Sequence, residues 1–504
     1  ANTPYSIGYV HEADIPVQYK LAEAFTVGDM YYESIISSTA PNRVSWFSGT
    51  INPPKGSKVN GTNKYMGGPT LDNRDSVGCE RTDSGKPFSC VPLRWKTVPE
   101  YLQEAGISWR VYQDKDNFGD DPLVMWKQYQ TSAKKKGDLA QRGTSFPGLQ
   151  KFFDDARDGK LPEVAYIVAP MQLSEHPPYM PMDGAWLQGE VAKAVMHGKN
   201  WDSTALIYSY DETGGWADHV VSPYPPQSEE SEWIEDPYDK SNGIAPIGPG
   251  FRLPFYIVSP WTSGGHVFTE HAAHESQIMF LEQWALAHGK PFTSEEIPTW
   301  RREQLSDLVK AFDFSSKDTS VPEVPHVRKP SQDIFTGHFN GADVCQAIHL
   351  KKVQPDIPYK KLNPSNSMEV NKGFKRLRGD VTEGRRLTFE AHNRALSHNG
   401  SKLKSSSSSK EHDEKDQLFV VHWQGVNPKD NRFRIATTDQ LYITKSLSLS
   451  KNEEKAALFS LKDMGNGVGY SISELDSGKR LQLNEDGSVA LGGDTYFQIY
   501  SVTL

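Results

Sequence analysis

The sequence is poor in cysteine, lacks long apolar runs and has no excess of basic residues. Only 3 of the 504 residues are cysteine. No apolar run approaches the roughly 18 residues that a membrane-spanning helix needs. Acidic residues (64) outnumber Lys and Arg (55), the net charge is −9, and no basic stripe interleaved with aromatics stands out. This balance argues against a nucleic-acid partner. The hydrophobic share of 37% is typical of a globular protein, and the length predicts two or more domains.

The few cysteines still carry information. Cys79 and Cys90 bracket a polar loop rich in turn formers, CERTDSGKPFSC, so we expect a local disulfide there; two free thiols are the alternative. Cys345 is then unpaired. Glycosylation triplets begin at Asn60 and Asn399. Together these features favour a secreted glycoprotein.

Residues 1–325 alternate apolar, strand-like stretches with helix-like ones. Helices are expected over 184–198 and over 268–289, the second with Thr269 as its N-cap and Gly289 as its stop. The strand-like stretches are 30–37, 107–112, 163–170, 204–210 and 253–260. The alternation predicts an α/β domain with a largely parallel sheet flanked by helices.

The residue composition and pattern change twice after this domain. Residues 326–365 are rich in proline and polar residues, which indicates a linker or a wrapping segment. Residues 366–504 consist of short alternating runs separated by turn signals, which predicts an all-β module. The pattern leaves a trefoil and a small sandwich open.

Acidic residues gather just after one of the predicted strands. Asp211 and Glu212 follow the stretch 204–210, two glycines come next, and then Asp218 and His219. In open α/β sheets, ligands bind beyond the carboxyl ends of the strands. Adjacent acids are costly unless a cation neutralises them, and their oxygens suit Ca²⁺, Mg²⁺, Mn²⁺ or Zn²⁺. The alternatives are a metal site and a solvated acidic turn.

Histidines follow two other predicted strands. His176 comes after the stretch 163–170, beside Glu175, while His271 and His274 lie in the helix expected after the stretch 253–260. Each alone is more often structural than catalytic. Their convergence with acids favours acid–base or metal chemistry.

A hydroxyl lies at the start of another predicted helix. Pro41 suits the first turn of a helix, because its missing N–H costs nothing there. Thr39 is then placed near the N-cap, facing free backbone N–H groups that attract phosphate. Thr39 is a candidate nucleophile, and a simple capping residue is the alternative.

Together these segments resemble one family, the phosphoesterases that include bacterial and fungal phospholipases C and the related acid phosphatases, within the alkaline-phosphatase superfamily. The similar stretches keep the family's order over residues 1 to about 290; they are 14–43, 112–118, 161–178, 210–220 and 250–276. The resemblance implies an alkaline-phosphatase-like fold. It also implies that Thr39 is the nucleophile, that Asp211 and Glu212 bind the metal, and that His176 is an active-site histidine. Asp218, His219 and His274 resemble further members of the same pocket.

The sequence departs from the family pattern at one place. The family's first strand, which ends in a Glu-Asn-Arg-Ser-Phe-Asp-His type of motif, has no counterpart before residue 14. A sheet without its first central strand exposes unpaired backbone. We therefore expect a separate N-terminal fragment of the same protein, produced by proteolytic nicking and disulfide-linked through Cys345, with truncation as the alternative.

The resemblance implies metal-dependent hydrolysis of phospholipid phosphodiesters, through a phospho-threonine intermediate on Thr39. Two alternatives remain at this stage, an acid phosphatase of the same fold and a non-catalytic secreted binding protein. The all-β module is either a cap on the catalytic domain or a means of touching a membrane or carbohydrate, and we expect at most transient contact with a membrane surface.

Overall fold

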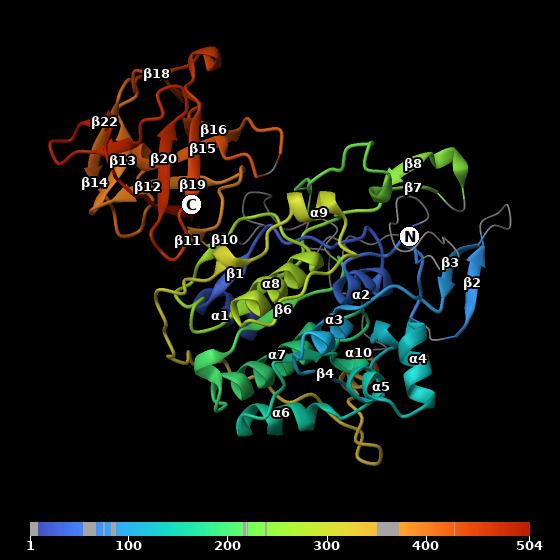
Figure 1. Ribbon diagram of the computed structural model, residues 1–504. Helices are drawn as coiled ribbons and strands as arrows, with labels where there is room; N and C mark the ends of the chain where they lie inside the picture. Colours follow the sequence, from blue (N-terminus) through green and yellow to red (C-terminus); the bar gives the residue numbers. More distant parts are fainter. Residues whose placement is uncertain are drawn as a thin grey trace.

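The computed structural model describes residues 9–53, 67–73, 76–81, 87–214, 218, 220–236, 239–349, 372–427 and 429–504. It contains a part rich in helices and a separate strand-rich part formed by the C-terminal residues, at the upper left of Figure 1. The helices are α1 (Pro16–Ala24), α2 (Thr39–Ser48), α3 (Val98–Glu104), α4 (Lys127–Lys134), α5 (Asp138–Gly143), α6 (Leu149–Asp158), α7 (Pro181–Met196), α8 (His274–Ala287), α9 (Thr299–Gln304) and α10 (Gly341–His349). The strands of the helix-rich part are β1 (Thr26–Gly28), β2 (Gly78–Arg81), β3 (Pro87–Val91), β4 (Trp109–Tyr112), β5 (Val164–Ile167), β6 (Leu206–Ser209), β7 (Trp233–Glu235), β8 (Ile244–Pro246), β9 (Phe255–Val258) and β10 (Val267–Phe268).

Four of the five expected strands form, but the expectation of a largely parallel sheet is wrong. Strand β9 pairs antiparallel with both β1 and β6, β1 pairs parallel with β10, and β4 and β5 form a separate parallel pair. An apolar run indicates that a strand is buried, but not whether it runs parallel or antiparallel to its neighbours. A strand covered on both faces is apolar along its length in either arrangement. The chain between β6 and β9 is a long excursion containing the β7–β8 hairpin rather than a crossover helix, so β9 returns antiparallel.

Helices cover both faces of this mixed sheet. Helices α1, α6 and α7 pack on one face, in a core that includes Leu21, Phe152 and Val191. Helices α2 and α8 lie side by side on the other face (Figure 1), in a core that includes Phe47 and Ile278. The α/β class and the flanking helices expected from the sequence are therefore confirmed.

Two local expectations are corrected. Helix α8 begins at His274 with Ala273 as its N-cap, so His271 lies before the helix. Thr269 is not a cap; its hydroxyl donates to the carbonyl of Asp380, 2.7 Å away, and so ties the segment before α8 to the C-terminal part. The stretch 30–37 makes only isolated bridges, at Tyr31 and Tyr32, instead of a regular strand.

The C-terminal part is all-β, as expected. Its strands are β11 (Gly373–Arg378), β12 (Arg386–Ala391), β13 (Arg394–His398), β14 (Leu403–Ser407), β15 (Phe419–Trp423), β16 (Arg432–Thr437), β17 (Tyr442–Ile443), β18 (Leu449–Ser450), β19 (Phe459–Asp463), β20 (Tyr470–Glu474), β21 (Leu481–Leu483), β22 (Val489–Leu491) and β23 (Gln498–Thr503). Strands β23, β12, β15, β16, β19 and β20 pair in succession, and a bridge between Tyr470 and Phe497 brings β20 back to β23. Three hairpins, β13–β14, β17–β18 and β21–β22, complete a threefold pattern that favours the trefoil over the sandwich.

The two parts are joined by direct strand pairing. Strand β10 pairs parallel with β11, so the sheet continues from one part into the other. The segment expected to be a linker, 326–365, contains α10 and then runs beyond the described residues. In the described chain, no helix has the length and apolar content required to cross a membrane.

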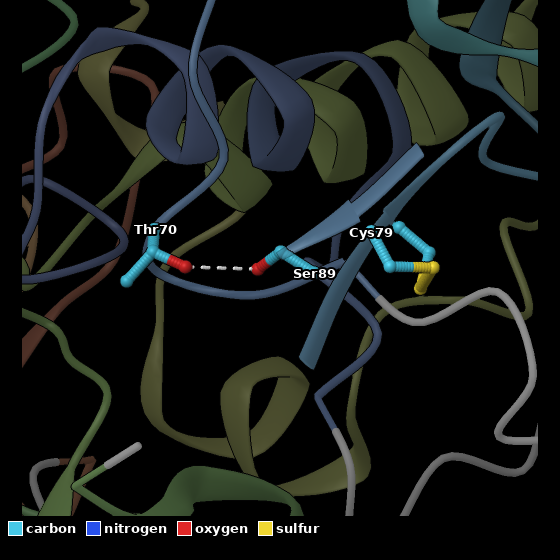
Figure 2. Close-up of a disulfide and its surroundings, with 4 residues drawn as sticks. Thr70, Cys79 and Ser89 are labelled. Atoms are coloured by element: carbon cyan, nitrogen blue, oxygen red, sulfur yellow. Dashed lines mark hydrogen bonds between the residues drawn. A yellow bond between two sulfur atoms is a disulfide. The ribbon is translucent and has the colours of Figure 1, made fainter. Parts of the chain in front are cut away.

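The expected disulfide is present. Cys79 on β2 and Cys90 on β3 face each other across the hairpin and are bonded (Figure 2). Next to Cys90, the hydroxyl of Ser89 lies 3.0 Å from that of Thr70, which ties the hairpin to the preceding loop. Cys345 is a free, half-buried thiol on α10.

Candidate active site

The amino end of α2 holds Thr39 in a fixed place. Ser38 is the N-cap, so the helix begins at Thr39, one residue earlier than a cap at Thr39 would give. The Asn42 side chain accepts a hydrogen bond from the N–H of Ile35 and donates to the carbonyl of the same residue, both at 2.9 Å. These bonds clamp the preceding loop onto the helix. Only 9% of Thr39 is exposed, and it belongs to the first turn of the helix, whose N–H groups have no partner within the helix.

An arginine on the same helix binds two carboxylates from distant segments. The Nε of Arg43 donates to Asp211 Oδ2 at 2.9 Å, and its Nη2 lies 3.2 Å from Asp120 Oδ2. Burial is the largest single influence on the pKa of Asp211 and raises it, but the charge and the hydrogen bond of Arg43, with smaller contributions, together hold that pKa below its usual value. For Asp120, burial prevails and the pKa is raised. One guanidinium therefore neutralises two acids only in part, which leaves the pocket short of positive charge.

The hydroxyl of Thr39 meets the second acid of the predicted pair. It donates to Glu212 Oε1 at 3.1 Å. Burial raises the pKa of Glu212, and the neighbouring charge of Asp211 raises it further; the Thr39 hydrogen bond and the His176 imidazole act in the opposite sense. The structure thus brings Thr39, Asp211 and Glu212 together, as the sequence predicts.

His274 supports this group from the start of α8. Its Nε2 lies 2.8 Å from the carbonyl oxygen of Asp211, so Nε2 must carry the proton and donate it. Its Nδ1 then accepts from the Tyr31 hydroxyl, also at 2.8 Å. Burial lowers the pKa of His274. Both ring nitrogens are therefore occupied, and this histidine positions Asp211 rather than offering a free nitrogen to a substrate.

His176 lies at the surface near Glu212 and Asp120, whose pKa values its charge lowers. It is exposed, its ring packs 5.4 Å from that of Phe118, and its Nδ1 contacts the carbonyl of Pro177 at 2.7 Å. The preceding Glu175 points the other way, into the protein, where its carboxylate accepts from the Tyr210 hydroxyl at 2.7 Å. Burial raises the pKa of Glu175 to about 7. Of the two, His176 is the one exposed at the surface.

The remaining predicted residues are placed differently. The carboxylate of Asp218 makes a two-pronged ion pair with Arg252, at 2.8 and 3.0 Å, rather than pointing at Thr39. His219 and the glycosylation triplet at Asn60 lie outside the described residues. Asn399 is exposed in the turn between β13 and β14.

Three oxygen donors converge where the sequence predicts a metal. Asp211, Glu212 and Thr39 offer two carboxylates and a hydroxyl, which are donors that suit a hard divalent cation. The raised pKa of Glu212 is also what a carboxylate lacking a cationic partner gives. However, the described ranges contain no group of three or more His, Cys, Asp or Glu arranged to hold a metal. The donors fit part of a ligand shell, since such cations take at least four ligands and usually six or more.

Sequence reasoning missed two members of the site, Arg43 and Asp120. Arg43 could have been found, because it follows Thr39 by four residues and therefore shares its face of the helix. Asp120 gives no such signal; it reaches Arg43 from a loop 77 residues further along the chain.

Comparison with known proteins agrees with the sequence-based resemblance. Residues 1–286 match the sequence profile of the Phosphoesterase family. Two similar curated proteins are described as non-hemolytic phospholipases C. That of Burkholderia pseudomallei is 33% identical over 352 residues, covering 64% of this chain and 47% of the relative, and that of Pseudomonas aeruginosa is 34% identical over 388 residues, covering 73% and 51%. A plant relative, the non-specific phospholipase C6 of Arabidopsis thaliana, is 27% identical over 393 residues, covering 73% of this chain and 66% of the relative. The chain thus spans about half the length of the two bacterial relatives.

Proposed function

Because the chain belongs to the Phosphoesterase family, we propose that it is a phosphoric ester hydrolase that cleaves phospholipid phosphodiesters as a phospholipase C. The observation that carries this proposal is the hydroxyl of Thr39, held at the amino end of α2 and hydrogen-bonded to Glu212 beside the Arg43–Asp211 pair. Free N–H groups at a helix start bind phosphate oxygens. The same residues that bind a phosphate therefore hold a nucleophile against it.

The reaction has two steps. The hydroxyl oxygen of Thr39 attacks phosphorus in line with the leaving oxygen, forming a threonine–phosphorus bond as the bond to diacylglycerol breaks. Glu212 accepts a hydrogen bond from the Thr39 hydroxyl and is placed to take its proton. His176, at the surface near Glu212, is placed to hold an equatorial oxygen or to protonate the leaving alkoxide. Water then hydrolyses the intermediate and releases the phosphorylated head group.

A divalent cation, Ca²⁺, Mg²⁺, Mn²⁺ or Zn²⁺, would be held by Asp211, Glu212 and Thr39 together with ligands from elsewhere. When bound, such an ion attracts phosphate oxygens and lowers the pKa of a coordinated hydroxyl. The partly neutralised carboxylates of the pocket support this assignment.

We further propose that the protein is secreted and glycosylated, and that it touches membrane surfaces only transiently. The disulfide between Cys79 and Cys90 supports an oxidising location. Asn399 is exposed and able to carry a glycan. Cys345, a free thiol that is half-buried on α10, is a candidate for linkage to an N-terminal fragment of the same protein. Comparing non-reducing with reducing gels, and then measuring intact masses, tests this linkage.

Substrate choice tests the function directly. A phospholipase C hydrolyses phosphatidylcholine vesicles faster than p-nitrophenyl phosphate, whereas an acid phosphatase does the reverse. Turnover of either must fall at least about a thousandfold in Thr39→Ala, because the nucleophile is lost. Thr39→Ser retains a hydroxyl and serves as the matched control. Absence of turnover on both substrates with all four cations, and no bound metal, would instead favour a binding protein.

A further inference from the structure

Two of the most exposed apolar side chains in the described chain are neighbours in sequence. Ile334 is 88% exposed and Phe335 is 89% exposed. Both belong to the segment 331–340, the gold segment that leads into α10 and projects at the lower edge of Figure 1. Single exposed apolar residues are common, but an adjacent pair with almost no cover indicates a surface that another apolar phase covers.

Hydrogen bonds hold this segment in a closed turn. Oδ1 of Asp333 accepts from the N–H groups of Phe335 and Thr336, at 3.0 and 2.8 Å. The N–H of Asp333 donates to the carbonyl of His338 at 2.8 Å. Ile334 and Phe335 are therefore presented at the tip of an ordered turn, and their burial requires little further ordering of the chain.

The base of the turn is fixed to the body of the protein at two places. A β-bridge joins Gln332 to Phe339, and the Phe339 ring packs 5.6 Å from that of Trp186 on α7. Nδ1 of His338 lies 3.1 Å from Oδ2 of Asp116. These contacts hold the turn beside the segment that carries Asp116.

That segment leads to the candidate active site. Phe118, two residues after Asp116, is 42% exposed, and its ring packs 5.4 Å from that of His176. His176 lies close enough to Glu212, the acceptor of the Thr39 hydrogen bond, to lower its pKa. The apolar turn, the partly exposed Phe118 and the candidate site are therefore connected by one series of contacts.

Basic residues accompany the apolar pair. Arg328 and Lys329 are exposed shortly before the turn, and Lys115, beside Asp116, is exposed as well. The carboxylate of Asp333 is bound within the turn, and that of Asp116 contacts His338. At a bilayer surface, Lys and Arg bind lipid phosphates while apolar side chains enter the acyl layer. An apolar tip with exposed cations before its base matches this order of layers.

We propose that the turn carrying Ile334 and Phe335 is a membrane anchor, whose two side chains enter the acyl layer of a phospholipid bilayer and bring the candidate active site to the lipid phosphates. The choice of a bilayer as the partner rests on the proposed function, because the substrate of a phospholipase C lies in one. A single acyl chain of 14 carbons gives only marginal, reversible membrane binding. Two side chains therefore give a contact that forms and breaks readily.

Vesicle binding tests the anchor without turnover. The 504-residue chain is mixed with sucrose-loaded phosphatidylcholine vesicles in EDTA, and the bound fraction is measured by sedimentation. We expect the double variant Ile334→Ser/Phe335→Ser to bind at least about tenfold more weakly, because the apolar area that enters the bilayer is lost. The matched control is Val426→Ser, which replaces a side chain that is 94% exposed in the C-terminal part and should leave binding unchanged.

A conservative pair of substitutions separates apolar insertion from a change of shape. Ile334→Leu/Phe335→Leu keeps two apolar side chains and should bind vesicles within about twofold of the unchanged chain. Equal binding by the Ser and Leu double variants, or no vesicle binding by the unchanged chain at millimolar lipid, overturns the proposal. Self-association through the turn in place of vesicle binding, detected by analytical ultracentrifugation, would identify a protein interface and would also overturn it.

Turnover on two substrates separates the anchor from the proposed function. In the Ser double variant, hydrolysis of phosphatidylcholine vesicles should fall about tenfold, while hydrolysis of monomeric dibutyryl phosphatidylcholine stays unchanged. Equal turnover of vesicles by this variant and by the unchanged chain would refute the anchor alone. A chain that binds vesicles through the turn but hydrolyses neither substrate would refute the proposed function alone.

Discussion

Replacement of Arg43 by methionine tests the electrostatics of the site. Methionine keeps much of the side-chain volume but removes the positive charge of Arg43, which pairs with both Asp211 and Asp120. Only 4% of the Asp120 side chain is exposed, against 26% of that of Asp211, so Asp120 is the acid that cannot turn to water. Removing one partner of a buried ion pair costs about 3–5 kcal/mol. We expect the lower end, about 3 kcal/mol at pH 7.5, because Asn73 still donates to Asp120 at 2.8 Å.

The cost of Arg43→Met must depend on pH, with a sign that follows from the structure. Burial already raises the pKa of Asp120 while Arg43 opposes it, so without Arg43 that pKa rises further. A carboxyl whose pKa is raised in the folded state loses stability as the pH increases from the unfolded pKa to the folded one. The variant should therefore be less destabilised at pH 5 than at pH 7.5.

Urea unfolding followed by tryptophan fluorescence measures this free energy. Arg157→Met is the matched control, because in the described chain that exposed arginine pairs with surface acids, and its loss should leave the midpoint unchanged. If Arg43→Met is as stable as Arg157→Met at pH 7.5, or becomes less stable on acidification, the assigned charge network is wrong.

Three further outcomes are expected. Burial raises the pKa of Glu175 from 4.5 to about 7, so between those pH values the folded state holds a proton that the unfolded state releases, and the free energy of unfolding falls by about 3 kcal/mol. Glu175→Gln should remove this part of the dependence of the unfolding free energy on pH, measured by urea titrations at several pH values. An unchanged pH dependence would contradict the burial argument. The Cys79–Cys90 disulfide joins residues 11 apart in sequence and stabilises the fold by about 3 kcal/mol. Its reduction should make the β2–β3 hairpin more susceptible to proteolysis. Equal cleavage of reduced and oxidised protein would show that the disulfide does not stabilise the hairpin. Glu212→Gln should weaken calorimetric binding of the activating cation at least about tenfold and lower turnover with it, whereas unchanged cation affinity would remove Glu212 from the ligand set.

Much of the framework could be predicted because apolar runs report burial directly. Strands β4, β5, β6 and β9 all lie within stretches that the sequence indicates. Their pairing could not be predicted, because direction depends on the connections, and the long excursion before β9 allows an antiparallel return. The predicted N-cap of α8 was wrong for a similar reason, because the hydroxyl of Thr269 donates to the carbonyl of Asp380, more than a hundred residues away.

The residues of the candidate site also fall into those that the sequence could predict and those that it could not. Thr39, Asp211 and Glu212 could be predicted because local signals, a helix start and adjacent acids after a strand, mark each of them. Asp120 could not, because its role exists only through Arg43, across the fold. Asp218 carries the same kind of local signal as Asp211, yet the structure pairs it with Arg252 instead.

Trapping the reaction intermediate tests the central claim most directly. The protein is mixed with phosphatidylcholine and a divalent cation, quenched in acid within one turnover, digested and analysed by mass spectrometry. The account predicts that the peptide containing Thr39 gains the mass of the phosphorylated head group, and that Thr39→Ala gains none. Rapid turnover with no modified peptide, or with the group attached to another residue, would contradict it.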